Sequence, residues 1–451
     1  MVAVGLAALQ LLPTVELVRM SARGAVRLDE PGFRFRVERA LKPAMLRTLM
    51  SPDSLGTPGQ WAAAGVPYSE TCGYVGRLTL LLALIGLVGV RSRQSVFYAG
   101  LAVLALNAAM GGVTARLVYY HVPGLGQAGG FARILCVYTF AVAVLAALGA
   151  DEVARWCAGA PASTGFLPRL GPWVGAVSAV LIFADLLAWG RAFLPLALRE
   201  RVYPETAAVE RLRQDAGKWR VLEVTHRGDW TLQRIPEAVL PPNAAMAYGY
   251  DSMQGYDSLR PGIYDRLAGQ VNPGGFCPVA NGNMVLLDNV GADVLSRAAV
   301  KWVVARDTEP LPGERYSEVW RGSGVVLYED SAASPRVRMV TRYIPTAEPE
   351  VLSTRFAGDP SRIVCELGPP PERLEIADTF WPGWHAFADG KEVRIRLRPP
   401  MFREIPLQPA TKHVELVYAP ASFQAGAFVS LMSLALIVGS VAFTRARAKQ
   451  G

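Results

Sequence analysis

The stretch HVELVYAPASFQAGAFVSLMSLALIVGSVAF, residues 413–443, places a strand pattern directly before a long apolar run. Its first residues alternate between polar and apolar side chains, which is typical of a half-buried β-strand. The run 425–443 is about as long as the roughly 20 apolar residues that a helix needs to cross a bilayer. Because Pro420 ends the strand just before this run begins, the sequence predicts a β-domain that stands directly on a membrane.

The rest of the chain repeats this division on a larger scale. Hydrophobic residues make up 51% of the 451 residues, and the mean hydropathy is +0.23. Most long apolar runs lie before residue 190, whereas 191–423 has the mixture of a water-soluble protein. Six runs approach the length of a membrane span: 2–17, 74–90, 96–113, 134–150, 172–190 and 425–443. The first run carries Pro13 and Glu16 and is either a short first helix or the continuation of something upstream.

The basic residues of the short loops predict the orientation of these spans. The tail after Phe443, the RSR at 91–93, Arg155 and Arg169 fall on one side if the spans alternate, and Lys and Arg favour the cytoplasmic side. This places 22–73, 114–133 and 191–423 outside the cytoplasmic membrane. The net charge of +8 is not gathered in a stripe, so we do not expect nucleic acid as a partner.

Four regions follow from these patterns. Residues 1–190 are expected to form a membrane domain of about five spans with an outer loop at 19–73, and 191–334 an extracytoplasmic α/β region. Strand-like segments separated by Pro and Gly turns predict an antiparallel β-sandwich over 335–423. Residues 424–451 are expected to form the final transmembrane helix and a basic cytoplasmic tail. The predicted fold class is a polytopic α-helical membrane protein carrying both extracytoplasmic parts.

Three membrane-side residues are candidates for substrate binding. Asp185 lies inside the fifth predicted span, where a carboxylate costs about 2.5–3.5 kcal/mol and by default suggests function. Asn107 lies at a similar depth and would share a polar network with it; alternatively, Asp185 reaches the interface near Trp189. Arg133 ends the glycine-rich link 121–133, which is either a headgroup-binding loop or a flexible connector.

A second group of candidates lies in the soluble part, in AMAYGYDSMQGYDSLRPGIYDRL at 245–267. Tyrosine rings beside carboxylates and an arginine suit a sugar, although aspartates that cap turns and tyrosines that pack would give the same pattern. The candidate residues are Tyr250, Asp251, Tyr256, Asp257 and Arg260.

The stretch TFWPGWHAFADGKEV, 379–393, holds two tryptophans, a histidine and an aspartate. Its WPGW and ADGKE segments predict two turns on either side of a short strand, with Trp381 and Trp384 either covered or facing outward. We favour an architectural role. No nucleotide, cofactor or paired-histidine motif occurs in the chain, so we expect no cofactor and no metal site.

The tail from Phe380 onward closely resembles the end of the YfhO-type bacterial membrane proteins. It shares an aromatic-Pro-Gly-Trp, an Asp-Gly-Lys turn, a His-Val-Glu strand and a Tyr-x-Pro before the final span. Three further segments also resemble parts of that family and follow in its order: LQLLPTVELVRMSARG, YVGRLTLLLALIGL and MQGYDSLRP. The link 121–133 departs from the family, because it lacks an Arg-x-Pro-x-Arg and keeps only Phe131 and Arg133.

The resemblance implies a bacterial cytoplasmic membrane protein related to the GT-C glycosyltransferases. Such proteins are linked to transfer of sugars from polyprenyl-phosphate carriers to envelope polymers such as teichoic acids. The family is usually longer, so this chain is expected to be a C-terminal portion without the catalytic first-loop carboxylate, and no catalytic residue is assigned. The expected partners are membrane lipids, a polyprenyl-phosphate sugar and a polymer acceptor. The alternative is a non-catalytic membrane-anchored envelope-assembly or polysaccharide-binding protein.

Overall fold

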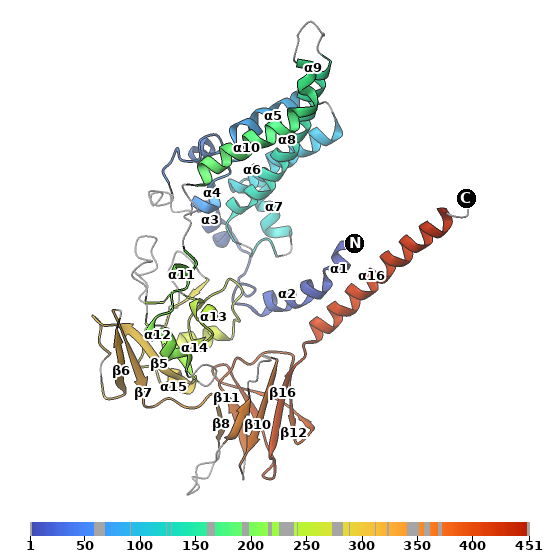
Figure 1. Ribbon diagram of the computed structural model, residues 1–451. Helices are drawn as coiled ribbons and strands as arrows, with labels where there is room; N and C mark the ends of the chain where they lie inside the picture. The colour runs from blue at the N-terminus through green and yellow to red at the C-terminus, as the bar shows by residue number, and fades with distance from the viewer. Residues whose placement is uncertain are drawn as a thin grey trace. The chain divides into compact units, whose positions relative to one another are not determined.

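The structure is a computed structural model, in which the chain forms two compact units: Met1–Ala25 with Arg199–Gly451, and Val26–Leu198 (Figure 1). We call them the β-unit and the helical unit and describe each by itself. The structure describes residues 2–57, 68–90, 92–122, 124–127, 129–159, 167–191, 198–214, 219–224, 239–240, 242–272, 283–287, 289–311, 313–322, 324–340, 351–355, 361–368 and 372–448.

The helical unit consists of α-helices and short 3-10 turns. Its elements are α3 Glu30–Glu38, η1 Pro43–Leu49, α4 Tyr68–Thr71, α5 Arg77–Gly89, α6 Arg93–Ala109, α7 Val113–His121, η3 Phe131–Ile134, α8 Leu135–Ala158, α9 Leu167–Leu170, η5 Gly171–Trp173 and α10 Val174–Gly190. Local sequence explains several helix starts. Asp29 accepts a hydrogen bond from the Gly32 amide before α3, and Ser92 accepts one from the Ser95 amide before α6, as capping residues do.

Helices α5 and α8 form the closest pair of this unit, and glycines permit their approach. A Cβ atom added at Gly149 would lie 1.9 Å from the Leu82 carbonyl oxygen, and one at Gly86 would lie 2.1 Å from that of Leu145. Small residues at such crossings let helix backbones approach closely. Because Gly86 meets Leu145 and Gly89 meets Glu152, the two helices run in the same direction.

The α/β part of the β-unit has one five-stranded sheet with the order β2–β1–β5–β7–β6. Its strands are β1 Arg220–Glu223, β2 Asp251–Ser252, β5 Val300–Arg306, β6 Tyr316–Gly322 and β7 Val325–Asp330. Strand β1 is parallel to β2 and β5, whereas β5, β7 and β6 are antiparallel. A small antiparallel pair joins β3 Gly255–Tyr256 to β4 Met284–Val285.

Helices cover both faces of this sheet. Leu222 packs with residues of α14 Tyr264–Val271 and α15 Asp293–Arg297, whereas its neighbour Val221 packs with residues of α12 Ala207–Arg213 and α13 Ala244–Tyr248. Successive residues of a strand point to opposite faces, so each strand contributes to two cores. The short helix α11 Arg199–Val202 precedes this part.

The strands after Arg336 form two antiparallel sheets, which confirms the prediction of antiparallel strands for this region. One sheet has the order β13–β12–β16–β10–β9 and the other β14–β15–β11–β8. Their strands are β8 Val337–Val340, β9 Val351–Arg355, β10 Arg362–Leu367, β11 Arg373–Ile376, β12 Trp384–Ala388, β13 Lys391–Val393, β14 Arg396–Arg398, β15 Phe402–Pro406 and β16 His413–Tyr418. Both sheets contribute to one hydrophobic core, which is how a sandwich is built.

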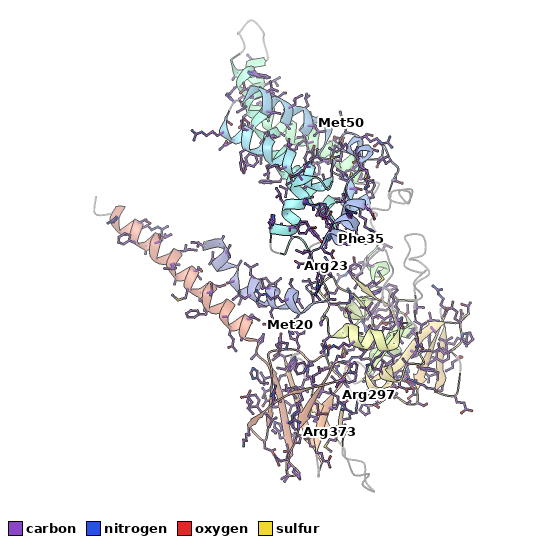
Figure 2. All side chains as sticks on the ribbon, turned by 180° about the vertical axis from the view of Figure 1, so that it is seen from behind. Met20, Arg23, Phe35, Met50, Arg297 and Arg373 are labelled. Atoms are coloured by element: carbon purple, nitrogen blue, oxygen red, sulfur yellow. The ribbon has the colours of Figure 1, made fainter. Side chains whose placement is uncertain are left out.

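The long helix α16 Ala421–Ala448 leaves the sandwich three residues after β16 ends and packs against α2 Ala8–Met20 (Figure 1). The short helix α1 Val2–Leu6 precedes α2. Ser430 of α16 accepts a hydrogen bond from the Leu9 amide at 2.9 Å and donates one to the Leu6 carbonyl oxygen at 2.9 Å. These groups flank the break between α1 and α2, where backbone groups lack helical partners. After α2, the guanidinium of Arg23, labelled in Figure 2, donates to Asn283 at 2.6 Å.

Three helices among the described residues are long and apolar enough to cross a membrane: Phe131–Ala158, Gly171–Gly190 and Ala421–Arg445. The pair Arg93–Ala109 and Val113–His121, bent by 81°, makes a fourth if it counts as one span. The expectation of six spans is therefore reduced to three or four. The predicted run 74–90 yields only the 13-residue α5, because Gly76 with a φ of 92° precedes its first turn. The run 2–17 is divided between α1 and α2.

Candidate functional site

A groove of about 760 Å³ runs between α5, α8 and α10 in the helical unit. Small side chains supply much of its wall, among them Ala143, Ala146 and Ala147 of α8 and Gly175 and Ala179 of α10. Short side chains leave the space between neighbouring helices unfilled. Ligand pockets of proteins measure about 300–1,000 Å³, so this groove has the volume of a binding site and an apolar wall.

Polar groups mark both ends of the groove. Tyr74 lines one end, and its hydroxyl donates a hydrogen bond to Oδ2 of Asp185 at 2.7 Å. The Arg77 amide donates to the same oxygen at 3.1 Å, so the carboxylate of Asp185 caps the first turn of α5. Asp151 lines the groove toward the other end of α8. Asp185 thus orients Tyr74 from behind rather than contributing to the described lining.

Thr79 is a further polar residue of this groove, whose lining also includes Thr139 and Ser178. Its side chain is buried, with 5% exposed, and it lines the wall. Its hydroxyl has no hydrogen-bond partner among the described residues. A buried hydroxyl without a partner costs about 1–3 kcal/mol. The hydroxyl is itself covered by protein, so it is a buried polar group within the wall rather than a partner that opens into the groove.

Arg133 lies at the same end of the helical unit as Tyr74, because it precedes α8 and Tyr74 precedes α5. Its Nε donates to Oε1 of Glu70 at 2.9 Å, and the pair remains largely exposed on the arginine side. Arg36 donates to the carbonyl oxygen of Gly129 in the same link. The predicted headgroup residue is thus held by a carboxylate that a bound anion would have to displace.

Asn107 stands apart from Asp185. Its Oδ1 accepts a hydrogen bond from the Thr114 amide at 2.9 Å, which ties the end of α6 to the start of α7. A Cβ atom on Gly112 would overlap the Asn107 amide. In the described part of the chain the two residues have separate partners, and the shared network expected for them is not formed.

The candidate residues of 245–267 have different hydrogen-bond partners and lie in different environments. Tyr250 is buried and donates to Glu223 Oε1 at 3.0 Å. Asp251 accepts from Arg336 at 2.6 Å, and Asp257 accepts from the Leu259 amide at 2.7 Å in a turn. Arg260 donates to Asp265 at 2.9 Å, whereas the side chain of Tyr256 is exposed. The five residues are thus near in sequence but do not form one cluster.

Glu223 is a buried carboxyl that the sequence analysis did not single out. It ends β1, and its second oxygen accepts a hydrogen bond from Ser252 at 2.6 Å. Burial raises the pKa of Glu223 against the opposing effect of the Ser252 and Tyr250 hydrogen bonds. A carboxyl at the carboxyl end of parallel strands occupies the edge where α/β sheets bind ligands. The signal was the charged residue within the apolar run of WRVLEV.

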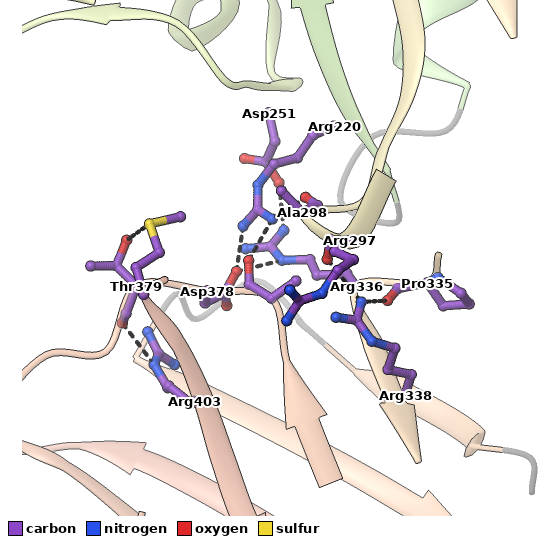
Figure 3. A network of polar contacts seen from close by, with 12 residues as sticks. Arg220, Asp251, Arg297, Ala298, Pro335, Arg336, Arg338, Asp378, Thr379 and Arg403 are labelled. Carbon is purple, nitrogen blue, oxygen red and sulfur yellow. Dashed lines mark hydrogen bonds and ion pairs between the residues drawn. The ribbon is translucent and has the colours of Figure 1, made fainter. Parts of the chain in front are cut away.

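A network of arginines and carboxylates joins the α/β part to the sandwich, as Figure 3 shows. Asp378 accepts hydrogen bonds from Arg220 and from Nε of Arg336, the latter at 2.8 Å. Burial alone would raise the pKa of Asp378, but the charges of Arg220, Arg336 and Arg403 hold it well below its usual range. Beside it, Arg338 pairs with the buried Glu375. The network fixes the sandwich against the sheet of the α/β part.

A second hollow, of about 460 Å³, lies on the sandwich beside the WPGW turn. Its lining includes Phe380, Trp381, Trp384, His385, Glu392 and Arg394. Nδ1 of His385 lies 2.8 Å from Oε1 of Glu392. Trp381 and Trp384 are half-buried, so both are partly covered and partly accessible. We call this hollow the tryptophan pocket.

The chain is thus a mixed α/β protein with several antiparallel sheets and three or four helices apolar enough to cross a membrane. No group of three or more His, Cys, Asp or Glu side chains suited to a metal ion occurs among the described residues. In comparisons with known proteins, no family model, no curated protein and no solved structure matches the chain. The groove and the tryptophan pocket are accordingly interpreted from their own geometry.

Proposed function

We propose that this chain is the C-terminal part of a glycosyltransferase-like membrane protein that acts on polyprenyl-phosphate-linked sugars in cell-envelope polymer glycosylation. Its own task in this proposal is to hold the lipid carrier. The observation that supports the proposal is the groove between α5, α8 and α10, with its apolar wall and its polar end at Tyr74. An isoprenoid chain is apolar along its length and carries a single polar head, which matches this distribution.

The small residues of the groove give a reason for selectivity. Lipid tails are as apolar as the groove, so transfer of a prenyl chain from bilayer to groove gains little hydrophobic free energy. Selection must then come from close packing and from the few polar partners in the wall. Ala143, Ala147 and Ala179 provide close access to the helix backbones, and Tyr74 is the polar residue at one end of the groove.

The charged residues at the Tyr74 end suit the phosphate. The guanidinium of Arg133 already binds a carboxylate, because its Nε and Nη2 both donate to Oε1 of Glu70, and arginine also binds phosphate oxygens. The phosphate of a carrier would compete with Glu70 for Arg133. We assign no catalytic residue to this chain.

A matched pair of α10 variants tests the proposal. Ala179 lines the groove, whereas Ala184 of the same helix is exposed and lies outside the described lining. The full chain in nanodiscs is labelled with a photoreactive polyprenyl phosphate. Ala179→Phe should fill the groove and lower the labelling at least five-fold, while Ala184→Phe should label like the wild type. Equal labelling of all three would exclude the groove as the carrier site.

The catalytic part of the proposal has its own measurement. The chain alone, given a polyprenyl-phosphate hexose and an envelope polymer, should show no sugar transfer. Transfer that survives purification and is lost on heat denaturation would overturn the view that this chain only holds the carrier.

A further inference from the structure

The tryptophan pocket is formed by a turn that contacts the residues just before α16. Gly383 has a φ of 90°, and a Cβ atom there would lie 2.8 Å from Pro420. The amide of Ala419 donates to the Gly383 carbonyl oxygen at 2.7 Å. Only glycine adopts this conformation at little cost and fits this contact. The turn is therefore held in one position, with Trp381 and Trp384 on either side of it.

Two neighbouring side chains, those of Arg403 and Tyr418, hold the ring of Trp384 in place. The guanidinium of Arg403 lies 4.1 Å from the centre of that ring, and the Tyr418 ring lies 5.3 Å away. Arg403 is only 5% exposed, and its Nε donates to the Thr379 carbonyl oxygen at 3.0 Å. A desolvated cation over an indole contributes about 2 kcal/mol or more. Trp384 thus presents a pre-positioned aromatic wall to the pocket.

Charged and polar groups also line the pocket. The side chains of His385 and Glu392 are 45% and 62% exposed, and Arg394 lines the hollow beside them. The contact between Nδ1 of His385 and Glu392 orients the imidazole and leaves its Nε2 for another partner. Aromatic faces beside convergent donors and acceptors are the features that a pyranose recognises, because its C–H faces are apolar and its edges carry hydroxyls.

We propose that the tryptophan pocket binds a hexose, with the sugar ring against Trp381 and Trp384 and its hydroxyls on His385, Glu392 and Arg394. The pocket belongs to the sandwich alone, so this inference does not depend on the groove in the helical unit. Strand β16 pairs Tyr418 with Trp384, and α16 begins at Ala421. The sugar would therefore come from a lipid-linked saccharide or from a polymer that lies near the membrane surface.

Aromatic residues at this place also have a simpler explanation, since tryptophans anchor proteins at the bilayer interface. The concave shape and the His385–Glu392 pair favour the sugar, because an anchoring surface needs neither. Phe423, in the first turn of α16 and 51% exposed, offers a matched aromatic residue outside the pocket. Its replacement separates the two explanations.

The experiment measures saccharide binding to the full chain in detergent by saturation-transfer NMR. Glucose, galactose and N-acetylglucosamine, with their oligomers, serve as free probes, and a short prenyl-phosphate hexose in nanodiscs serves as the lipid-linked one. Trp381→Ala should weaken binding at least ten-fold and Glu392→Gln several-fold, while Phe423→Ala should leave it unchanged. Binding of either probe with this pattern supports the proposal and identifies the source of the sugar.

Two results would overturn the proposal. The first is binding of no probe, or binding that Trp381→Ala leaves intact in protein whose thermal unfolding is unchanged. The second is quenching of the Trp381 fluorescence by brominated lipids, with no protection by any saccharide. The Trp381 fluorescence is the part of the emission that the wild type has and Trp381→Phe lacks. That result would assign Trp381 to the membrane interface. Trp384→Ala is not used, because its contacts with Arg403 and Tyr418 make it part of the fold.

Discussion

The groove and the tryptophan pocket are two hollows made in opposite ways. The groove exists because α8 and α10 carry small side chains where larger ones would fill the space. The tryptophan pocket exists because large side chains are held apart, with Trp384 fixed against Arg403 and the turn fixed at Pro420. The first site is determined by side-chain volume, and the second by a buried charge network. The groove should therefore respond to substitutions that change side-chain volume, and the tryptophan pocket to substitutions and pH changes that alter charge.

The largest expected effect is on the network behind the pocket. Asp378→Asn would leave Arg220, Arg336 and Arg403 buried without their shared counter-charge, and breaking a buried ion pair costs about 3–5 kcal/mol. Denaturant unfolding of the purified chain measures this loss. Asp293→Asn, at a side chain that is 99% exposed, should change stability by less than about 0.5 kcal/mol.

The same carboxylate predicts a pH dependence that the groove should not share. The pKa of Asp378 is lower in the folded protein than the value of about 3.9 in an unfolded chain. Its stabilising contribution is therefore present above about pH 4 and is lost as the pH falls toward the folded pKa. Acid should unfold the wild type more steeply than Asp378→Asn. A titration with equal slopes for both proteins would show that the network does not set the acid stability.

The next largest effect concerns the helix contact that shapes the groove. Gly149→Ala places a Cβ atom 1.9 Å from the Leu82 carbonyl oxygen, whereas Gly100 has no heavy atom within 4 Å of such a Cβ. Overpacking costs about 1–3 kcal/mol, so Gly149→Ala should lower the unfolding temperature in detergent. Gly100→Ala should hold or raise that temperature, because alanine favours helix. Equal effects of the two variants would mean that α5 and α8 do not meet at Gly149.

A smaller effect of opposite sign is expected inside the groove. Thr79→Val removes a buried hydroxyl that has no partner in the described residues, so stability should stay level or rise by about 1 kcal/mol. Tyr74→Phe gives the comparison, because it breaks the bond to Asp185 and should lower stability by about 1–2 kcal/mol.

The smallest effect on stability is expected at the edge of the tryptophan pocket. His385→Gln breaks an exposed contact with Glu392, and exposed pairs contribute about 0–1 kcal/mol. Unfolding should therefore be nearly unchanged while hexose affinity falls several-fold. Loss of stability beyond about 1 kcal/mol would make the pair a structural element instead.

Local patterns predicted a substantial part of the fold. The alternation in segments such as RIVCELG and HVELVYA predicted antiparallel strands, and these became β10 and β16 of one sheet. The apolar runs near 134–150, 172–190 and 425–443 predicted helices, which α8, α10 and α16 confirm. The prediction that the runs 2–17 and 74–90 each form one membrane span was wrong, because composition does not reveal where Ala7 or Gly76 interrupts a helix.

The sites were less predictable than the elements. Asp185 was selected as an unusual carboxylate in an apolar run, and it does lie behind a residue of the groove. The alanines and glycines that make the groove gave no signal, because such residues are common in any apolar helix. Tyr250 and Asp251 are adjacent in the chain, yet one contacts Glu223 and the other Arg336, because Tyr250 ends the turn before β2 and Asp251 is the first residue of that strand.

By itself, the sequence determined the division into apolar helices and β-rich parts, the antiparallel strands after Arg336 and the two turns around HAFA. These features depend on periodicity and turn residues within a short window, and such signals are local. The tertiary structure alone decided which helices leave a groove between them, and that Arg403 covers Trp384 while Asp378 joins Arg220 to Arg336. Those contacts join residues from different elements, and no local pattern records which distant side chain will meet another.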